Sequence, residues 1–199
     1  MHGVQCSWPI GGEIDIIEGA NLQTETITTL HTRPGCAMNP DCPRFPEMTG
    51  KFHPTNRNCD TEANGNSGCS VKSGIPYGEP LNAMGGGVFV MEWRELKISA
   101  WFFKHGEEPD NYLAGHPDPS TWGAPYAAFP LENNCASTHF EDLQLVFDNT
   151  FCGQYRPVLP SRLVFMHVCD VCVTHLLTRR RIRTWTLVNL NGHGLILLQ

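Results

Sequence analysis

The chain has 199 residues and a net charge of −6, with 19 glycines, 15 prolines and 17% charged side chains. This length fits one domain with a real core, and the glycine and proline content favours a loop-rich β architecture over a helical bundle or a disordered chain. Residues 1–155 carry 19 of the 20 acidic and only 8 of the 14 basic side chains. Because such a body repels phosphate backbones, we expect no nucleic-acid partner.

The first 12 residues contain no apolar core of a secretory signal, and no run approaches the roughly 18 to 20 apolar residues of a membrane span. We therefore expect no membrane anchor. Nine cysteines without a metal-like C-x-x-C pair in the body favour disulfides, and hence an oxidising compartment. Together these features predict a piece of a secreted protein whose N-terminal part precedes this sequence.

Near-alternating Ile and Thr predict strands at 12–18 and 25–31. Residues 33–82 are dense in Pro, Gly, Asn and Cys, which predicts a long functional or disulfide-pinned loop. Further strands are predicted at 87–93, 96–103 and 143–147. Antiparallel strands with irregular connections, and without the helices of parallel crossovers, predict an all-β sandwich or jelly roll.

The composition changes after about residue 156, where six basic side chains accompany a single acidic one. The apolar stretch 163–177 could form a strand pair or a helix, because periodicity alone does not distinguish them. We interpret the arginines at 179–183 as a solvated basic stretch. The C-x-x-C at 169–172 is interpreted as incidental, since no second pair and no βαβ context accompany it.

The stretch GGEIDIIEG at 11–19 places three carboxylates within six positions. In a strand, Glu13 and Asp15 share one face while the isoleucines between them point into a core. Glu18 would face the opposite side of a regular strand. One extra residue, inserted as a β-bulge at Ile16-Ile17 where the alternation breaks, would return it to the first face, so we predict a bulge there.

With this bulge, Glu13 and Glu18 lie about 13 Å apart at Cα, and side chains that lean together bring the carboxyls to roughly 6 Å. This separation is close to that of retaining glycosidases and at the low edge of the inverting range, so retention is favoured. In a retaining enzyme one carboxylate attacks the anomeric carbon and the other acts as acid and base. Asp15 between them would hold the nucleophile and raise the pKa of a neighbour. Spaced carboxylates are equally typical of a Ca²⁺ site or a solvated acidic edge.

The motif E-x-D-x-x-E after Trp8-Pro9 resembles the signature of glycoside hydrolase family 16, and in particular the fungal laminarinase-like β-glucanases. Further similar blocks follow in the family's order. They are TLHT (29–32), NGNSGC (64–69), GGGVFVMEW (85–93), WFF (101–103), DPSTWG (118–123), and HF with FDNTFCG (139–153). The resemblance covers about residues 3–155.

The resemblance implies an all-β, concanavalin A-like β-jelly roll of two curved antiparallel sheets, here incomplete, with a glucan cleft on its concave face. Residues 1–155 would be a partial catalytic domain, and 156–199 a divergent basic tail. The implied activity is retaining, endo-acting hydrolysis of β-1,3- or mixed-linkage β-1,3(4)-glucan by a monomeric, extracellular protein without cofactor or metal. By match to the motif, Glu13 would be the nucleophile, Glu18 the acid/base and Asp15 the helper.

Five further residues are candidate substrate contacts. The aromatic faces of Trp8, Trp93 and Trp122 could stack on a pyranose ring, although a core tryptophan is the competing reading, as it is for Trp101 inside WFF. By resemblance, His31 lines the active site and could bond sugar or carboxylate, with a structural histidine as the alternative. Glu92 resembles a subsite residue that accepts hydroxyl hydrogen bonds, with a solvated strand edge as the alternative.

The cysteines predict three disulfides. Cys59 and Cys69 flank a short Asn/Gly loop that suits a local bridge. Cys135 with Cys152 resembles a second family pair, and Cys36 with Cys42 is the candidate for a third.

Two other functions remain open on the residues alone. The same jelly roll serves lectins, so the chain could be a non-productive glucan-binding module or an inactive fragment. A transglycosylase would use the same carboxyls. The chain also departs from the family pattern at Lys104-His105, at Tyr155 and in its closing strand.

Overall fold

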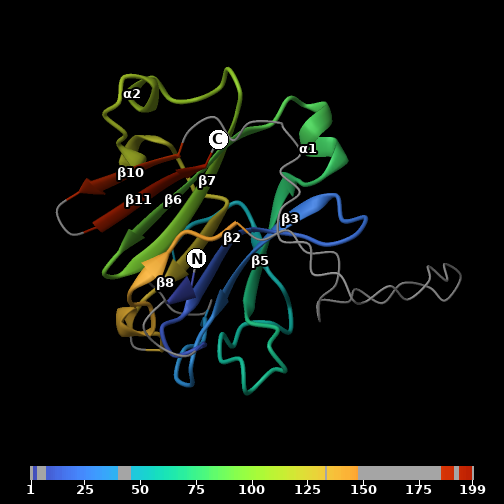
Figure 1. The fold of residues 1–199 in the computed structure, drawn as a ribbon, viewed down its shortest axis with the longest axis vertical. Helices are drawn as coiled ribbons and strands as arrows, with labels where there is room; N and C mark the ends of the chain where they lie inside the picture. Colours follow the sequence, from blue (N-terminus) through green and yellow to red (C-terminus); the bar gives the residue numbers. More distant parts are fainter. Residues whose placement is uncertain are drawn as a thin grey trace, which may run out of the picture.

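Strand pairing and burial sort the chain into two antiparallel sheets (Figure 1). The computed structural model describes residues 2–3, 8–39, 46–132, 134–147, 185–190 and 193–198. Every strand pairing within these ranges is antiparallel. The predicted all-β jelly-roll class is therefore confirmed, with short helices confined to the connections.

The first sheet has the strand order β4-β5-β3-β2-β1-β9. Its strands are β1 (His2–Gly3), β2 (Glu13–Glu18), β3 (Glu25–His31), β4 (Lys51–Phe52), β5 (Cys69–Pro76) and β9 (Leu143–Gln144). Strands β2 and β3 lie near the middle of this sheet, so both have hydrogen-bonded neighbours on each side.

The second sheet has the order β10-β11-β6-β7-β8. Its strands are β6 (Gly87–Arg94), β7 (Lys97–Lys104), β8 (Ala127–Pro130), β10 (Trp185–Leu190) and β11 (His193–Leu198). In Figure 1 the red strands β10 and β11 extend the sheet of β6 and β7. Short helices occupy the connections: α1 (Glu79–Ala83), α2 (Asp110–Leu113), η1 (Pro119–Thr121) and η2 (Ser137–His139).

The main core lies between the two sheets. Alternation along β2 and β3 turns Ile14 and Leu30 inward, where both are fully buried. The second sheet meets them with Phe89, Met91 and Phe129, which belong to the same buried cluster. Because side chains on a strand alternate between its faces, residues next to these core positions point away from the core.

A smaller apolar cluster covers the outer face of the second sheet. It consists of Val88, Val90 and Trp101, with Phe103, Tyr112 and Trp122 packed against them. The rings of Trp122 and Trp101 meet edge to face, with centroids 5.6 Å apart. This cluster anchors the connection that carries α2 and η1.

Four of the five predicted strands coincide with β2, β3, β6 and β7 to within about one residue. The fifth, at 143–147, is only the two-residue β9. Strands β4 and β5 lie inside the stretch 33–82, which the sequence predicts to be a long loop. Of the region expected to be a divergent tail, residues 185–190 and 193–198 form β10 and β11, and the stretch 163–177 lies outside the described residues.

Two disulfides join described cysteines. The predicted Cys59–Cys69 bridge is confirmed. The predicted pairings of Cys36 with Cys42 and of Cys135 with Cys152 are wrong, because Cys36 is bonded to Cys135. The Ala37 N–H donates to the carbonyl of Asn134 at 2.7 Å, so the two loops run side by side and bring these cysteines together.

Cys42, Cys152 and the C-x-x-C cysteines lie outside the described residues. Within the described ranges, none of the helices has the length and apolar character that crossing a membrane requires.

Candidate active site

A β-bulge divides strand β2. Glu13 pairs with His31 and Asp15 with Thr29, but Glu18 pairs with Ile27, so the register shifts by one residue between Asp15 and Glu18. The extra residue falls at Ile16-Ile17, where Ile16 is buried and Ile17 is 38% exposed. The predicted bulge is therefore confirmed, and all three acidic side chains emerge on the face of the first sheet that points away from the core.

The irregular backbone at the bulge is stabilised by two hydroxyls from the core. A bulged residue loses ladder partners, which leaves its carbonyl in need of another donor. The Thr28 hydroxyl lies 2.9 Å from the carbonyl oxygen of Ile16, and the Tyr126 hydroxyl lies 3.2 Å from the same oxygen. Tyr126 precedes β8, so this contact also ties the two sheets together at the bulge, and its burial raises the pKa of the Tyr126 phenol.

Glu13 is held by the tryptophan of the preceding turn. The indole N–H of Trp8 donates to Oε2 of Glu13 at 2.8 Å. The Trp8 ring is 46% exposed and lies 6.4 Å from the His31 ring, centroid to centroid. Trp8 therefore orients one carboxylate oxygen while keeping ring surface available to solvent.

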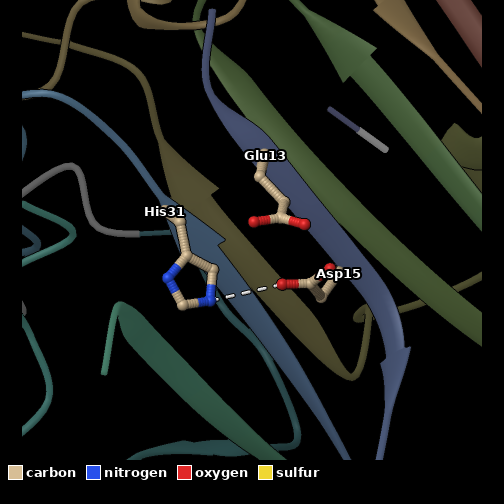
Figure 2. Close-up of side chains that lie close together, drawn as sticks. All are labelled: Glu13, Asp15 and His31. Carbon is tan, nitrogen blue, oxygen red and sulfur yellow. Dashed lines mark ion pairs between the residues drawn. The ribbon is translucent and has the colours of Figure 1, made fainter. Parts of the chain in front are cut away.

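Asp15 is paired with His31 on the neighbouring strand. Figure 2 shows Glu13, Asp15 and His31 directed toward one another from β2 and β3. Nε2 of His31 lies 3.3 Å from Oδ2 of Asp15, and His31 is 7% exposed. This contact fixes the Asp15 carboxylate between the two glutamates.

Glu18 receives a hydrogen bond from Thr29, whose hydroxyl lies 2.7 Å from Oε2 of Glu18. Burial raises the pKa of Glu18, and the nearby charges of Asp15 and Glu13 raise it further. The Thr29 bond and the His31 charge lower it, but burial outweighs them and the pKa stays above the ordinary value of 4.5. A carboxyl that keeps its proton at higher pH is suited to act as a general acid.

The pKa of His31 responds to opposing influences. Burial lowers it, whereas the bond to Asp15 and the charges of Asp15, Glu13 and Glu18 raise it. The carboxylates together outweigh burial, so the pKa lies above the ordinary value of 6.5. At mildly acidic pH His31 therefore carries a positive charge that partly compensates the three acids.

The disulfide loop between Cys59 and Cys69 packs against His31. Gly68 adopts φ +61°, and a Cβ built there would lie 2.6 Å from the carbonyl oxygen of Leu30 and 2.9 Å from Cε1 of His31. Asn64 donates to the carbonyls of Asn58 and Gly68 and so closes the loop. The loop backbone thus packs directly behind the site.

Three predicted substrate contacts lie elsewhere in the fold. Glu92 has the outward parity of β6, opposite to the core-facing Met91, and its carboxylate lies 2.7 Å from Nη2 of Arg94. Trp93 packs against the core between the sheets. Trp122 belongs to the outer-face cluster, where its indole donates to Asn111 at 2.7 Å. Strand alternation therefore separates these residues from the acidic face of the first sheet.

Two residues beside Glu18 were not identified from the sequence. Thr29 and the Ser70 that pairs with it lie on the acidic face. Thr29 shares the parity of His31 within ETITTLH, which is a signal that could have marked it. Ser70 offers no such signal, since it lies in the unpredicted strand β5.

A cation is the competing occupant of this face. One ligand atom each of Glu13, Asp15 and His31 lie within 4.8 Å of one another, a spacing that a metal ion could bridge. In the structure Oε2 of Glu13 accepts a hydrogen bond from Trp8, and Nε2 of His31 lies against Oδ2 of Asp15. An ion bound through these three atoms would replace both contacts.

An antiparallel β-sandwich in which a bulged strand presents two glutamates around an aspartate on one face is the arrangement expected of a jelly-roll glycoside hydrolase. The chain belongs to glycoside hydrolase family 16. Residues 2–177 match the family described as "XgeA-like, catalytic GH16 domain".

Curated relatives are similar to about three quarters of the chain. A probable glycosidase of Schizosaccharomyces pombe is 44% identical over 150 residues, which are 74% of this chain and 35% of that protein. An endo-1,3(4)-beta-glucanase of Arthroderma benhamiae is 39% identical over 153 residues, covering 74% of this chain and 32% of that protein. The chain thus spans about a third of the length of these relatives.

Solved structures share the fold. GH16 laminarinase 16A from Phanerochaete chrysosporium, described with beta-glucans in both donor and acceptor sites, is 40% identical, with a TM-score of 0.60. That similarity covers 70% of this chain and 47% of the laminarinase. A structure described as an elongating GH family 16 beta-1,3-glucosyltransferase is 35% identical with a TM-score of 0.59, covering 69% of this chain and 44% of that one.

Proposed function

We propose that the chain carries the catalytic centre of a retaining endo-β-1,3(4)-glucanase. Glu13 is the nucleophile, Glu18 the acid/base and Asp15 the residue that holds them apart and in place. The observation that carries the proposal is the bulge, which puts Glu18 on the face of Glu13 and Asp15, where burial raises its pKa. The family and the two glucan-related proteins support β-1,3- or mixed-linkage glucan as the substrate.

In the first step, a carboxylate oxygen of Glu13 attacks the anomeric carbon and forms a glycosyl ester. The bond between that carbon and the leaving oxygen breaks, and protonated Glu18 gives its proton to this oxygen. The raised pKa of Glu18 keeps the proton available at mildly acidic pH. The Trp8 bond leaves one oxygen of Glu13 fixed while the other is directed to the sugar.

In the second step, ionised Glu18 takes a proton from water, and the hydroxide oxygen attacks the same carbon from the face that the leaving group vacated. The ester bond breaks and Glu13 returns to its carboxylate form. Asp15 keeps its place through the His31 contact at 3.3 Å during both steps. Two inversions at one carbon retain the β configuration.

Substrate contact is proposed for Trp8, whose half-exposed ring can stack on a pyranose, and for His31 beside it. The placements of Glu92, Trp93 and Trp122 support packing and ion-pair roles instead. Two disulfides among the described cysteines support an extracellular location. The proposed mechanism uses only side chains of one chain, so the protein is proposed to act as a monomer without a cofactor.

The test uses the recombinant 199-residue chain, with folding checked by circular dichroism. We expect the wild type to cleave laminarin and to release the β-anomer first, observed by proton NMR. Glu13→Gln and Glu18→Gln should each lower kcat/KM by about 1,000-fold or more. Glu107→Gln, at an exposed surface glutamate, is the matched control and should behave as wild type.

A folded wild-type chain that cleaves no glucan, or a Glu13→Gln variant that retains activity, would overturn the proposal. Glucan binding without cleavage, measured by affinity electrophoresis, would instead identify a binding module.

Transglycosylation is the second candidate, favoured by the similarity to the glucosyltransferase structure. The same glycosyl ester forms, but a glucan hydroxyl replaces water in the second step. Mass spectrometry of products from laminarihexaose distinguishes the two. Hydrolysis gives only shorter oligosaccharides, whereas transfer gives products longer than the substrate.

A further inference from the structure

Three hydrogen-bonding groups form a chain across the acidic face. The Thr29 hydroxyl lies 2.7 Å from Oε2 of Glu18 and 3.2 Å from the hydroxyl of Ser70. A hydroxyl has only one proton to give. Because the carboxylate accepts the proton of Thr29, the Ser70 hydroxyl must donate to the Thr29 oxygen.

Strand register explains why this chain forms. Asp15, Thr29 and Ser70 lie directly opposite one another on β2, β3 and β5. Glu18 pairs with Ile27, which is two residues before Thr29 on β3, and the Glu18 side chain extends along the face to bond Thr29. The bulge alone would leave the long Glu18 side chain free to sample several rotamers, so a fixed donor in the adjacent row is needed to select one.

Both hydroxyls are removed from solvent, since Thr29 is 1% exposed and Ser70 is 7% exposed. A buried hydroxyl is costly unless it is bonded, and here Thr29 donates to Glu18 while Ser70 donates to Thr29. Among the described residues, no hydrogen bond reaches Oε1 of Glu18. One oxygen of the carboxyl is thereby fixed, while the other is left to carry the proton.

We propose that Thr29 and Ser70 are positioning residues that orient Glu18 for proton transfer to the leaving oxygen. Thr29 holds Oε2 of Glu18, and Ser70 fixes the rotamer of the Thr29 hydroxyl. The inference rests on the proposed function, because it specifies how the acid/base of that reaction is aimed. Neither residue touches the reacting atoms.

The test compares Thr29→Val, which keeps the branched shape but loses the hydroxyl, with Thr29→Ser, which keeps the hydroxyl. The substrates are laminarin and a 2,4-dinitrophenyl β-laminaribioside, whose leaving group departs without a proton. We expect Thr29→Val to lower kcat/KM for laminarin by about 10-fold or more, as for a lost bond to a charged group. The loss on the dinitrophenyl substrate should stay within about 3-fold.

The pH profile gives an independent readout. Because the Thr29 bond lowers the pKa of Glu18, its removal should move the descending limb of kcat/KM to higher pH. Thr29→Ser should restore both the limb and the laminarin rate to within about 3-fold of wild type. Ser70→Ala should shift both in the direction of Thr29→Val, by a smaller amount.

The inference would be overturned if Thr29→Val lost kcat/KM equally on both substrates and left the descending limb of the pH profile unmoved. Thr29 would then have only a structural role. If Thr29→Val does not fold, Ser70→Ala carries the same comparison. Glu18→Gln is measured in parallel. An active Glu18→Gln would overturn the proposed function itself, whereas an inactive Glu18→Gln beside a wild-type-like Thr29→Val would overturn only this inference.

Discussion

Trp8 and Glu13 are joined by a hydrogen bond of 2.8 Å from the indole N–H to Oε2, although the tryptophan lies in a turn and the glutamate begins strand β2. We expect Trp8→Phe to remove this bond while keeping an aromatic ring for the sugar. Since the bond is exposed to solvent, kcat for laminarin should fall by about 5- to 10-fold with KM changed less than 2-fold.

Steady-state kinetics with Trp101→Phe provides the comparison. That substitution also removes an indole N–H, which donates to the Gly123 carbonyl at 3.2 Å on the outer face of the second sheet. It should leave kcat unchanged. A fall in kcat no larger for Trp8→Phe than for Trp101→Phe would count against the orienting role of Trp8.

Glu18 and His31 should each contribute less stability as the pH rises, because both bind protons more tightly in the folded state than in the unfolded chain. The pKa of Glu18 is raised by burial, so its contribution is present below about pH 4.5 and is lost as pH rises through its folded pKa. The pKa of His31 is also raised, despite burial, by its carboxylate partners, so its contribution is present below about pH 6.5 and is lost above its folded pKa.

Denaturant unfolding between pH 4 and pH 9 checks this sign. Glu18→Gln should be more stable than wild type at pH 7, where wild-type Glu18 is ionised and partly buried, and nearly equal to it at pH 4. The exposed Glu107→Gln should show no such difference. A Glu18→Gln variant that is less stable than wild type at pH 7 would contradict the prediction.

The two disulfides should contribute unequally to stability. The Cys36–Cys135 bridge spans 99 residues and the Cys59–Cys69 bridge only 10. From loop-closure entropy, their removal by paired serine substitutions should cost about 4.7 and about 2.7 kcal/mol respectively. Peptide mapping without reduction should recover a Cys36–Cys135 cross-link, and a Cys135–Cys152 cross-link in its place would contradict the structure.

Two glycines of the disulfide loop allow steric and conformational costs to be separated. Gly65 and Gly68 have nearly the same φ, +62° and +61°, but a Cβ meets nothing within 4 Å at Gly65 and crowds the Leu30 carbonyl at Gly68. Gly65→Ala should therefore cost about 1 kcal/mol of stability. Gly68→Ala should cost at least about 1 kcal/mol more and lower kcat, because His31 must shift. Equal thermal midpoints for the two variants would contradict the predicted steric cost of a Cβ against the Leu30 carbonyl.

The sequence was sufficient where local pattern governs structure. Alternation in EIDIIE predicted both the strand and the break at Ile16-Ile17, because a core-facing isoleucine row tolerates an extra residue only as a bulge. Likewise, Cys59 and Cys69 lie close enough in the chain for their loop to predict their bridge.

The remaining features depend on which segments meet in space. Cys36 bonds Cys135 because two loops that are far apart in the sequence run side by side in the fold. Strand β5 has a Ser- and Gly-containing sequence that resembles a loop, and pairing with β3 overrides that preference. The place of Glu92 in the second sheet is a further example, because alternation along β6 predicts which residues share a face of the strand but not which sheet the strand joins.

Side chains on a regular strand alternate between two faces, and the bulge in β2 shifts this alternation by one residue partway along the strand. The bulge thus separates two halves of the strand. One half carries Glu13 and Asp15, the other carries Glu18, and each has its own register on β3. Selection could therefore adjust the reach and twist of the acid/base half without disturbing how the nucleophile half is seated. One inserted residue makes a rigid sheet adjustable at the point where two groups must flank a single bond.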